Sequence, residues 1–310
     1  MRVYSYLSDI YGTGPCCVVL GTFDGLHLAH RRLLERCLEV SKEQGLTPLV
    51  FTFANNPANV ISGEDRVRSV CTVEQKAELI EAMGFEHMAC IPFSKSFMEN
   101  DPEHFVAEVL LGSIDMKHAV CGYDYRFCYH AEGTPEKLAE LGEKYGFGLS
   151  VIPKMEIDGR VVSSTLLRSM IAQGDLAGFE RYAGRPYAIE GYVRHGRGEG
   201  GPHGFPTMNL DPGAELQLPP RGVYASLCHM DGKEYRAVSN LGVKPTAGLF
   251  PENLETYVFG FSGDAYGKKI SVELIELIRP EMKFSGLEEL GAQVEKDKAA
   301  ALRALEAKKL

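Results

Sequence analysis

The sequence lacks any apolar run long enough to span a bilayer, and its N-terminus, MRVYSYLSDIYG, lacks the charged and then apolar stretch of an export signal. These absences argue against a membrane protein and against a secreted one. We therefore expect a cytoplasmic protein without a membrane partner. The hydrophobic content of 45% and the charged content of 24% are ordinary for a soluble globular protein.

Paired cysteines and basic clusters are also missing. The eight cysteines are scattered without a CxxC spacing, which favours reduced thiols over a disulfide framework or a zinc site. The net charge is −9 and the basic residues are dispersed, so we do not expect nucleic acid as a partner. A local basic pocket for a nucleotide is compatible with this composition. Nothing in the sequence indicates the oligomeric state.

The length of 310 residues suits two domains. In the first half, apolar strand-like runs alternate with amphipathic helical patterns, which predicts an α/β domain with a doubly wound parallel sheet. The predicted strands are 17–20, 48–53, 87–91, 118–121 and 149–152. The predicted helices are 30–44, 73–83, 102–111 and 135–145. Ligands of such sheets bind beyond the carboxyl ends of the strands.

The pattern changes after Gly184-Arg185-Pro186, where short alternating runs are separated by turns rich in glycine and proline. This predicts a small antiparallel β-barrel or sandwich with strands at 187–193, 222–229, 235–241, 256–261 and 270–278. The tail 287–310 has the pattern of an amphipathic helix. We therefore predict one domain over residues 1–183 and a second, barrel-like domain with a terminal helix over residues 184–310.

The stretch from Gly21 to His30 carries the strongest chemical signal. An apolar run breaks at Gly21, and two histidines three residues apart, His27 and His30, stand where a helical pattern begins. Such a turn aims unpaired backbone N–H groups and the positive end of the helix dipole at one point, which suits a phosphate. Both imidazoles share one helical face and can reach the same anion. Two ordinary surface histidines are the simpler alternative, which the glycine-broken turn disfavours.

A second segment, from Ser163 to Arg168, follows the last predicted strand of the first half and opens a helix. Ser164 or Thr165 can cap that helix, which is the purely structural explanation. The functional explanation adds Arg168, one turn further on, as a cation that faces the same cleft as the histidines. The two segments together favour the functional explanation.

G-T-F-D-G-x-H-x-x-H followed by S-S-T-x-x-R resembles the adenylyltransferase module of the bacterial bifunctional riboflavin kinase/FMN adenylyltransferases, also called FAD synthetases. Thr52-Phe53, the segment 122–127 and Gly133 fit the same family in order. The resemblance implies a nucleotidyltransferase-like fold and a reaction in which the FMN phosphate attacks the α-phosphorus of ATP, forming FAD and releasing pyrophosphate. Such a transfer needs alignment and charge stabilisation more than covalent chemistry.

The resemblance also implies three groups of site residues. The nucleotide-binding turn contributes Gly21, Phe23, Asp24, His27 and His30, and its histidines would bind the ATP phosphates. A second group would stabilise the departing pyrophosphate: Ser164, Thr165 and Arg168. On the flavin side, Asp124 would line the site.

Three positions depart from the family pattern. Ala29 stands where the family has a glycine between the histidines, Asn56 where it has a histidine before Pro57, and Cys128 where it has a glycine. The methyl group of Ala29 adds bulk where the backbone would approach a phosphate. An alternative function is therefore a riboflavin kinase whose adenylyltransferase domain is slow or degenerate.

The second half contains Gly204-Phe205-Pro206-Thr207-Met208-Asn209 after a glycine-rich segment at 195–201. Glycines let a backbone approach a polyphosphate closely, although a surface loop has the same composition. The Thr207 hydroxyl and the Asn209 amide, at i and i+2 of an extended segment, point the same way. Both supply hard oxygen ligands of the kind that Mg²⁺ accepts when it also holds ATP. We therefore expect Mg²⁺ at Thr207 and Asn209, with Gly204 and Pro206 in the nucleotide loop.

Glu255 matches a glutamate that the family carries at the start of a later strand. The resemblance implies that it acts as general base on the 5′-hydroxyl of riboflavin during transfer of the γ-phosphoryl group. A surface glutamate on an edge strand is the structural alternative. Segments 240–246, 266–267 and 279–284 also fit the family in order, whereas Gly201 replaces a residue that is commonly basic.

The leading hypothesis is thus a two-domain enzyme that makes FMN and then FAD, with riboflavin, FMN, FAD and ATP as its partners. A non-catalytic flavin-binding protein is a second hypothesis, but binding alone needs neither a metal-ligand pair nor a base. A class I aminoacyl-tRNA synthetase shares the HxxH turn. The chain shows no basic tRNA-binding face and no lysine-rich second signature, which argues against that class.

Overall fold

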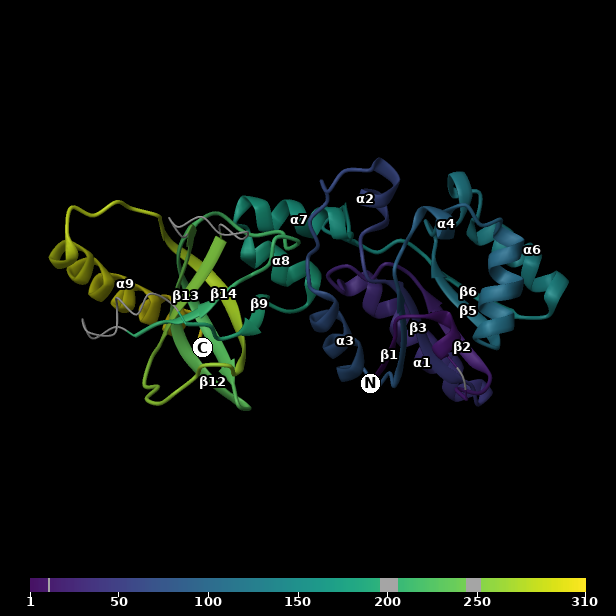
Figure 1. Ribbon diagram of the computed structural model, residues 1–310, viewed down its shortest axis with the longest axis horizontal. Coiled ribbons are helices and arrows are strands. Elements are labelled where there is room, and N and C mark those ends of the chain that lie inside the picture. Colours follow the sequence, from purple (N-terminus) through teal and green to yellow (C-terminus); the bar gives the residue numbers. More distant parts are fainter. Residues whose placement is uncertain (11, 196–205, 244–251) are drawn as a thin grey trace. The chain divides into compact units, whose positions relative to one another are not determined.

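The computed structural model describes residues 1–310 apart from 11, 196–205 and 244–251. The described chain forms two compact units, Met1–Leu166 and Leu167–Leu310, each with its own main sheet (Figure 1). The division between them falls inside one helix, α7 (Ser164–Gln173). The domain boundary between residues 183 and 184 stays a prediction.

A six-stranded sheet in the order β1-β4-β3-β2-β5-β6 forms the middle of the first unit. The strands are β1 (Arg2–Tyr4), β2 (Cys16–Leu20), β3 (Thr47–Phe53), β4 (His87–Ile91), β5 (Met116–Gly122) and β6 (Gly148–Ile152). Every pairing is parallel, which confirms the doubly wound sheet. Because β3 and β5 flank β2, the strand order reverses there, and a crevice is expected at the carboxyl ends. The sequence patterns missed β1, a short edge strand.

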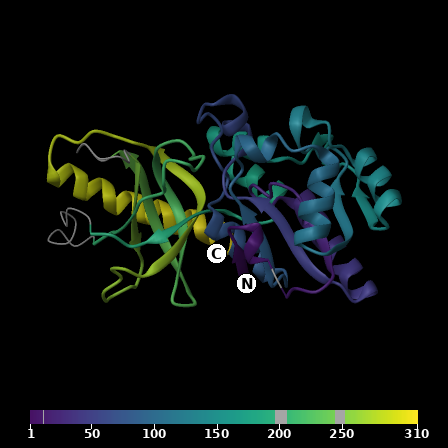
Figure 2. The ribbon, with the colours of Figure 1, turned by 45° about the vertical axis from the view of Figure 1, so that its right-hand side comes forward.

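Helices pack against both faces of this sheet (Figure 2). In chain order they are η1 (Leu7–Asp9), α1 (Leu28–Gln44), α2 (Pro57–Ser62), α3 (Val73–Ala82), α4 (Lys95–Met98), α5 (Pro102–His104), the π-helix η2 (Phe105–Ser113), η3 (Tyr129–Ala131) and α6 (Pro135–Tyr145). Local signals set their ends. A capping box of Thr72 and Gln75 opens α3, and Gly45 ends α1 at a φ of 66°.

The core of the first unit follows from the alternation along β2, in which all five residues are buried. Val18 packs in the cluster that contains Phe105 of η2, whereas Val19 packs in the cluster that contains Leu34 of α1. A short hairpin of β7 (Glu156–Ile157) and β8 (Arg160–Val161) then leads to α7. All eight cysteines of the chain are free, and all except the half-buried Cys128 are buried.

The second unit begins with the rest of α7, then α8 (Leu176–Ala183), and contains an antiparallel sheet in the order β10-β13-β12-β11-β14-β9. Its strands are β9 (Tyr187–Tyr192), β10 (Met208–Leu210), β11 (Gly222–Met230), β12 (Lys233–Val243), β13 (Glu252–Val258) and β14 (Lys269–Pro280). The N–H of Arg194 donates to the carbonyl of Asn209 (2.9 Å), so the chain after β9 meets β10 and the sheet curls into a barrel. This confirms the predicted barrel.

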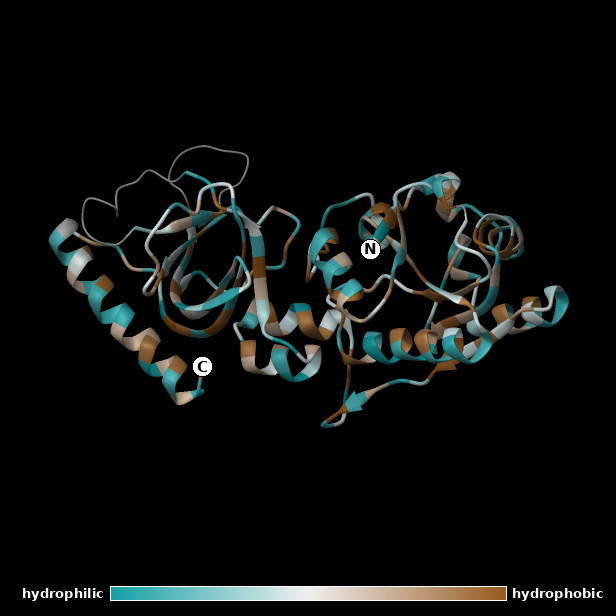
Figure 3. Cartoon of the chain, turned by 90° about the horizontal axis from the view of Figure 1, so that it is seen from below, coloured by the Kyte–Doolittle hydropathy of each residue, from teal (hydrophilic) through white to brown (hydrophobic). Residues whose placement is uncertain are grey.

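The predicted terminal helix is present as α9 (Leu287–Ala307), with polar and apolar residues along it (Figure 3), and it packs on the barrel. Its buried Ala301 and Leu305 share a core cluster with Val223 and Leu227 of β11. The strand predicted over residues 256–261 was placed wrongly at both ends, and β10 was not among the predicted strands. β13 begins at Glu252 rather than at residue 256, because polar residues with a hydrogen-bonding role interrupt the apolar alternation there.

Candidate active sites

A cleft of about 700 Å³ opens in the first unit, at the carboxyl ends of its strands. Its walls come from the segments that follow five strands: Leu20–Thr22 after β2, Phe53 and Pro57 after β3, Phe93 and Phe97 after β4, Gly122–Ala131 after β5, and Ile152–Met155 after β6. His27, His30 and Ser163–Thr165 also line it. The cleft therefore lies where the strand order reverses, which is the position that the sequence predicted for a ligand.

The turn between β2 and α1 has an unusual backbone, with positive φ at Phe23 (48°), Gly25 (80°) and Leu26 (38°). Phe23 is fully buried, and a Cβ at Gly21 would lie 3.0 Å from its ring, which explains the glycine. Asp24 is also buried, and its Oδ1 accepts the N–H of Val70 at 2.7 Å. Phe23 and Asp24 thus fix the conformation of the turn through buried contacts.

His27 and His30 lie together at the start of α1. His27 is the N-cap, and its Nδ1 accepts the N–H of His30 at 3.1 Å. The two rings stack with centroids 3.6 Å apart, and the edge of Phe23 meets His30 at 5.2 Å. Burial, together with the neighbouring His27 and Lys76, holds the pKa of His30 well below its usual value. The His30 ring is therefore uncharged at neutral pH.

A buried lysine that the sequence patterns missed stands behind this turn. Lys76, on α3, is 6% exposed, and its Nζ donates to the carbonyls of Thr22 (2.9 Å) and Phe53 (3.1 Å). Its third contact is the hydroxyl of Thr52 at 3.4 Å, and that hydroxyl donates to Thr22 at 2.9 Å. Lysines are seldom fully buried, so a buried lysine with three hydrogen bonds is an unusual feature of this turn. In the sequence, Lys76 is one polar residue among several on a predicted amphipathic helix, so nothing marked it as buried.

The start of α7 reaches the cleft through Ser163, Ser164 and Thr165. The Ser164 hydroxyl donates to the carbonyl of Asp24 at 2.8 Å, so it joins α7 to the histidine turn across 140 residues of sequence. Thr165 is exposed at the cleft. Arg168 is half-buried one turn further along α7 and is counted with the second unit. The structure therefore brings Ser164 and Thr165 to the histidines, and Arg168 follows them on the same helix.

The wall that follows β5 carries both Asp124 and Cys128. Asp124 is exposed at the cleft, as expected for a ligand-facing residue. Cys128 adopts φ 63° and ψ −168°, a backbone conformation that is essentially restricted to glycine. Burial, reinforced by the negative charge of Asp101, raises the pKa of its thiol to about 12, so the thiol stays protonated. Replacing glycine here introduces backbone strain without introducing a reactive thiolate.

Aromatic rings form the apolar side of the cleft; the family resemblance had included Phe53, Tyr125 and Phe127 but not Phe93 or Phe97. Phe53, Phe93 and Phe97 are in mutual edge contact, with ring centroids 4.9 to 6.0 Å apart. Tyr125 stacks on Phe127 at 5.5 Å. These rings come from the ends of three different strands, so no local spacing in the sequence could reveal the cluster. Together they give the cleft an aromatic, apolar side, which is the kind of lining that contacts heteroaromatic ligands.

Two asparagines, Asn55 and Asn56, stand before Pro57, where the resemblance had led us to expect a histidine. The Asn55 side chain donates to the carbonyl of Phe93 at 3.0 Å and accepts its N–H at 2.7 Å, which joins the ends of β3 and β4. Asn56 caps α2 by accepting the N–H of Ala58 at 3.0 Å. Both residues therefore order the rim of the cleft.

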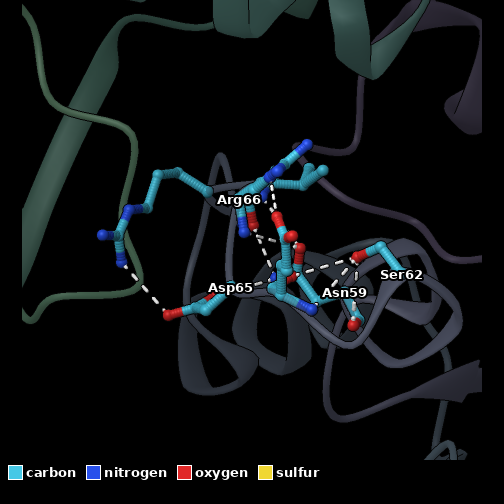
Figure 4. Close-up of polar contacts among 7 residues, drawn as sticks. Asn59, Ser62, Asp65 and Arg66 are labelled. Carbon is cyan, nitrogen blue, oxygen red and sulfur yellow. Dashed lines mark hydrogen bonds and ion pairs between the residues drawn. The ribbon is translucent and has the colours of Figure 1, made fainter.

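The loop after α2 is organised around Asn59 (Figure 4). Its Oδ1 accepts the N–H groups of Arg66 (3.2 Å) and Val67 (2.8 Å), and its Nδ2 donates to Asp65 (2.9 Å). The Ser62 hydroxyl donates to the carbonyl of Asn59 at 3.3 Å. This network fixes the segment next to Pro57 and Ile61, which line the cleft.

The second unit holds a separate polar cluster on three neighbouring strands. Asn209 of β10 and Asn240 of β12 both lie opposite Glu255 of β13, so the three side chains share one face of the sheet. Asn253, which is 5% exposed, donates from Nδ2 to Oδ1 of Asn209 and to Oε1 of Glu255, each at 3.1 Å. The structure thus brings Asn209 and Glu255 together, and it adds Asn253, which the sequence had not indicated.

The rest of the predicted kinase site precedes β10. Thr207 is half-buried and its carbonyl lies 3.4 Å from the Asn209 amide nitrogen, whereas Pro206 is exposed. Gly204, the glycine-rich segment 196–201 and residues 244–246 lie outside the described residues. Among the residues that are described, no group of three or more histidine, cysteine or acidic side chains could hold a metal ion.

Comparison with known proteins supplies the wider context. The FAD synthetase family model matches residues 11–166, and the riboflavin kinase family model matches residues 183–305. The bifunctional riboflavin kinase/FMN adenylyltransferase of Bacillus subtilis (strain 168) is 33% identical over 291 residues, with 92% of this chain and 91% of that protein covered. The protein of the same description from Escherichia coli (strain K12) is 31% identical, with 92% and 91% covered.

A solved structure is similar over nearly the whole chain. It is described as a macrolide-efflux protein from Streptococcus pneumoniae, with a TM-score of 0.83 and 26% identity, and 97% of this chain and 98% of that chain are covered. In the present structure, the described residues include no helix with the length and apolar character to cross a membrane.

Proposed function

The chain belongs to the family of bifunctional riboflavin kinase/FMN adenylyltransferases, and from this membership we propose which residues of each unit carry the two reactions. It is a transferase that phosphorylates riboflavin to FMN and then adenylylates FMN to FAD, with ATP as the nucleotide substrate. The non-catalytic flavin-binding alternative is not favoured. The cytoplasm as the compartment of both reactions stays a prediction.

In the second unit, Glu255 is the proposed general base for riboflavin phosphorylation. The observation that supports it is the hydrogen-bonded sequence Asn209–Asn253–Glu255 on two paired strands. The donated hydrogen bond from Asn253 orients one oxygen of the carboxylate. The carboxylate accepts the proton of the riboflavin 5′-hydroxyl while that oxygen bonds to the γ-phosphorus of ATP. The bond from the γ-phosphorus to the bridging oxygen breaks, and ADP leaves with the electron pair.

Asn209 and Thr207 are the proposed holders of Mg²⁺. The donor set fits this ion because both residues offer neutral hard oxygens and the phosphates of ATP would supply the negative charge. Oδ1 of Asn209 receives one hydrogen bond, from Asn253, and an amide oxygen has a second acceptor site that remains for a cation. When bound, Mg²⁺ would neutralise charge on the ATP phosphates.

In the first unit, the histidine turn and the start of α7 are the proposed adenylyl-transfer site. His27 and His30 would donate hydrogen bonds to the ATP phosphates at the N-terminus of α1, and Thr165 would contact them from α7. An oxygen of the FMN phosphate bonds to the α-phosphorus, and the bond to the β-phosphate oxygen breaks. Pyrophosphate leaves with the electron pair, and Arg168 would stabilise its charge. The phenylalanine rings would bind the flavin ring, with Asp124 beside it.

A product assay with the full chain tests these assignments. Riboflavin, ATP and Mg²⁺ should give FMN first and FAD later, followed by chromatography of the flavins. His30→Asn should stop FAD formation and leave FMN formation intact. Wild-type enzyme that accumulates FMN without FAD, even with pyrophosphatase, would contradict the adenylyl-transfer assignment and support the kinase with a degenerate first domain. Absence of both products would contradict the assignments in both units.

A further inference from the structure

Lys76 is buried behind the histidine turn without lining the cleft. Its three contacts are two carbonyls and one hydroxyl, all neutral, from Thr22 and from the end of β3. A buried ammonium held by neutral oxygens has a considerable desolvation cost. A neutral side chain of similar length would supply neither the positive charge nor three donors at this place, so these are what Lys76 contributes.

We propose that Lys76 is a positioning residue for adenylyl transfer, which holds the Thr22 backbone in place and sets a positive charge behind the histidine pair. This inference rests on the proposed role of the His27/His30 turn. Thr22 itself lines the cleft, so the position of its backbone helps to define the phosphate-binding surface. The Thr52 hydroxyl supports the same carbonyl from the side, at 2.9 Å.

The charge has a second consequence, which concerns the protonation of His30. Nδ1 of His30 is buried and has no hydrogen-bond partner in the described part of the chain. The titratable groups that act on this ring are His27, from the same turn, and Lys76, from α3, while the Phe23 edge carries no charge. Burial, His27 and Lys76 all lower the pKa of His30, so each favours the neutral ring. Lys76 thereby helps to keep His30 a neutral hydrogen-bond donor.

The sign of the pH dependence follows. A lowered pKa leaves His30 neutral at neutral pH, so the titration of its ring changes the rate only in acid. Without the Lys76 charge the pKa of His30 rises, and the acidic limb of the rate profile moves to higher pH. The shift should not exceed about one pH unit, which is the scale of a single nearby charge at intermediate dielectric.

The experiment measures kcat/KM for ATP in FMN adenylylation against pH, in wild type, Lys76→Met and Thr52→Val. We expect Lys76→Met to lower kcat/KM about tenfold or more and to move the acidic limb upward, as for the loss of one or two hydrogen bonds to a charged group. Thr52→Val should lower kcat/KM less and leave the acidic limb in place, because the charge remains. Lys42→Met, at an exposed position near the end of α1, is the matched control for loss of a lysine charge.

Riboflavin phosphorylation by the same polypeptide controls for protein quality. Should Lys76→Met fail to fold, Lys76→Gln keeps a donor, removes the charge and should show the same shift. A reduced rate with the wild-type pH profile would overturn the charge assignment, and an unchanged rate would overturn the proposal entirely. His30→Asn separates this outcome from failure of the proposed site. If that variant retains adenylyl transfer, the histidine turn is not the site and the role of Lys76 fails with it.

Discussion

The side chains proposed for phosphate chemistry stand on different kinds of structure in the two units. In the first unit, functional side chains stand on turns beyond the ends of parallel strands, and distant contacts such as Ser164 to Asp24 fix those turns. In the second, Asn209 and Glu255 lie within paired strands, so the register of the barrel places them. The positions of side chains on turns depend on the residues that pack against those turns. The positions of side chains within a sheet depend on the pairing of its strands. The proposed site in the first unit should therefore respond to substitutions well outside the cleft.

The largest effect is expected at Glu255. Glu255→Gln keeps the shape of the side chain but removes the base, so FMN formation should fall by about 10²- to 10⁴-fold, the usual contribution of general base catalysis. FAD formation from supplied FMN should be nearly unchanged, which separates the two units. The test is to measure the initial rates of riboflavin phosphorylation and of FMN adenylylation on one preparation. A normal kinase rate would remove Glu255 from the mechanism.

A substitution of Arg168 tests the site proposed for adenylyl transfer. Arg168→Ala should lower FAD formation by about 10²-fold, comparable to the loss of one donor that stabilises developing charge. Phosphorylation of riboflavin should continue at the wild-type rate. Both rates are measured by chromatography of the flavins. If a folded variant lost both activities, the two sites would not be independent.

Asn253 tests whether strand register alone places the kinase residues. Asn253→Ala leaves the backbone pairing in place and removes the donor shared by Asn209 and Glu255, each 3.1 Å away. We expect the kinase kcat to fall about tenfold, as for the loss of one or two hydrogen bonds near a charged group. Steady-state kinetics of riboflavin phosphorylation at varied Mg²⁺ concentrations would measure this fall in kcat. A kcat equal to that of wild type would mean that register suffices and that the amide has no positioning role.

The smallest effect concerns strain in the first unit. Cys128→Gly should stabilise the protein by about 1 kcal/mol, because glycine adopts the observed conformation without the penalty of a side chain. Urea unfolding followed by circular dichroism gives the free energy of unfolding. Cys128→Ser retains the Cβ and is the matched control, for which no gain is expected. Equal stability of the Gly and Ser variants would show that the strain is relaxed elsewhere.

Sequence patterns were sufficient for elements that depend on local signals. The β2 strand, the glycine at its end and the start of α1 near His27 and His30 all lie within one short segment, so periodicity located them. Four of the barrel strands, β9, β11, β12 and β14, also followed from alternation and turn residues. Lys76, the contacts among Phe53, Phe93 and Phe97, and the role of Asn253 could not be found this way, because each depends on partners distant in the sequence. Lys76 reaches Thr22 across 54 residues, and nothing in the neighbourhood of either residue records that contact.

The distribution of thiols makes the two units separately observable. Seven of the eight cysteines lie in the first unit and Cys228 alone lies in the second, where it is buried. A buried thiol reacts with an alkylating reagent only when the structure around it opens, so its labelling rate measures the free energy of that opening. Peptide mass spectrometry of a single labelled sample would thus give local stabilities for both units of the unmodified enzyme. Substrates that bind one unit should slow labelling of its own cysteines selectively.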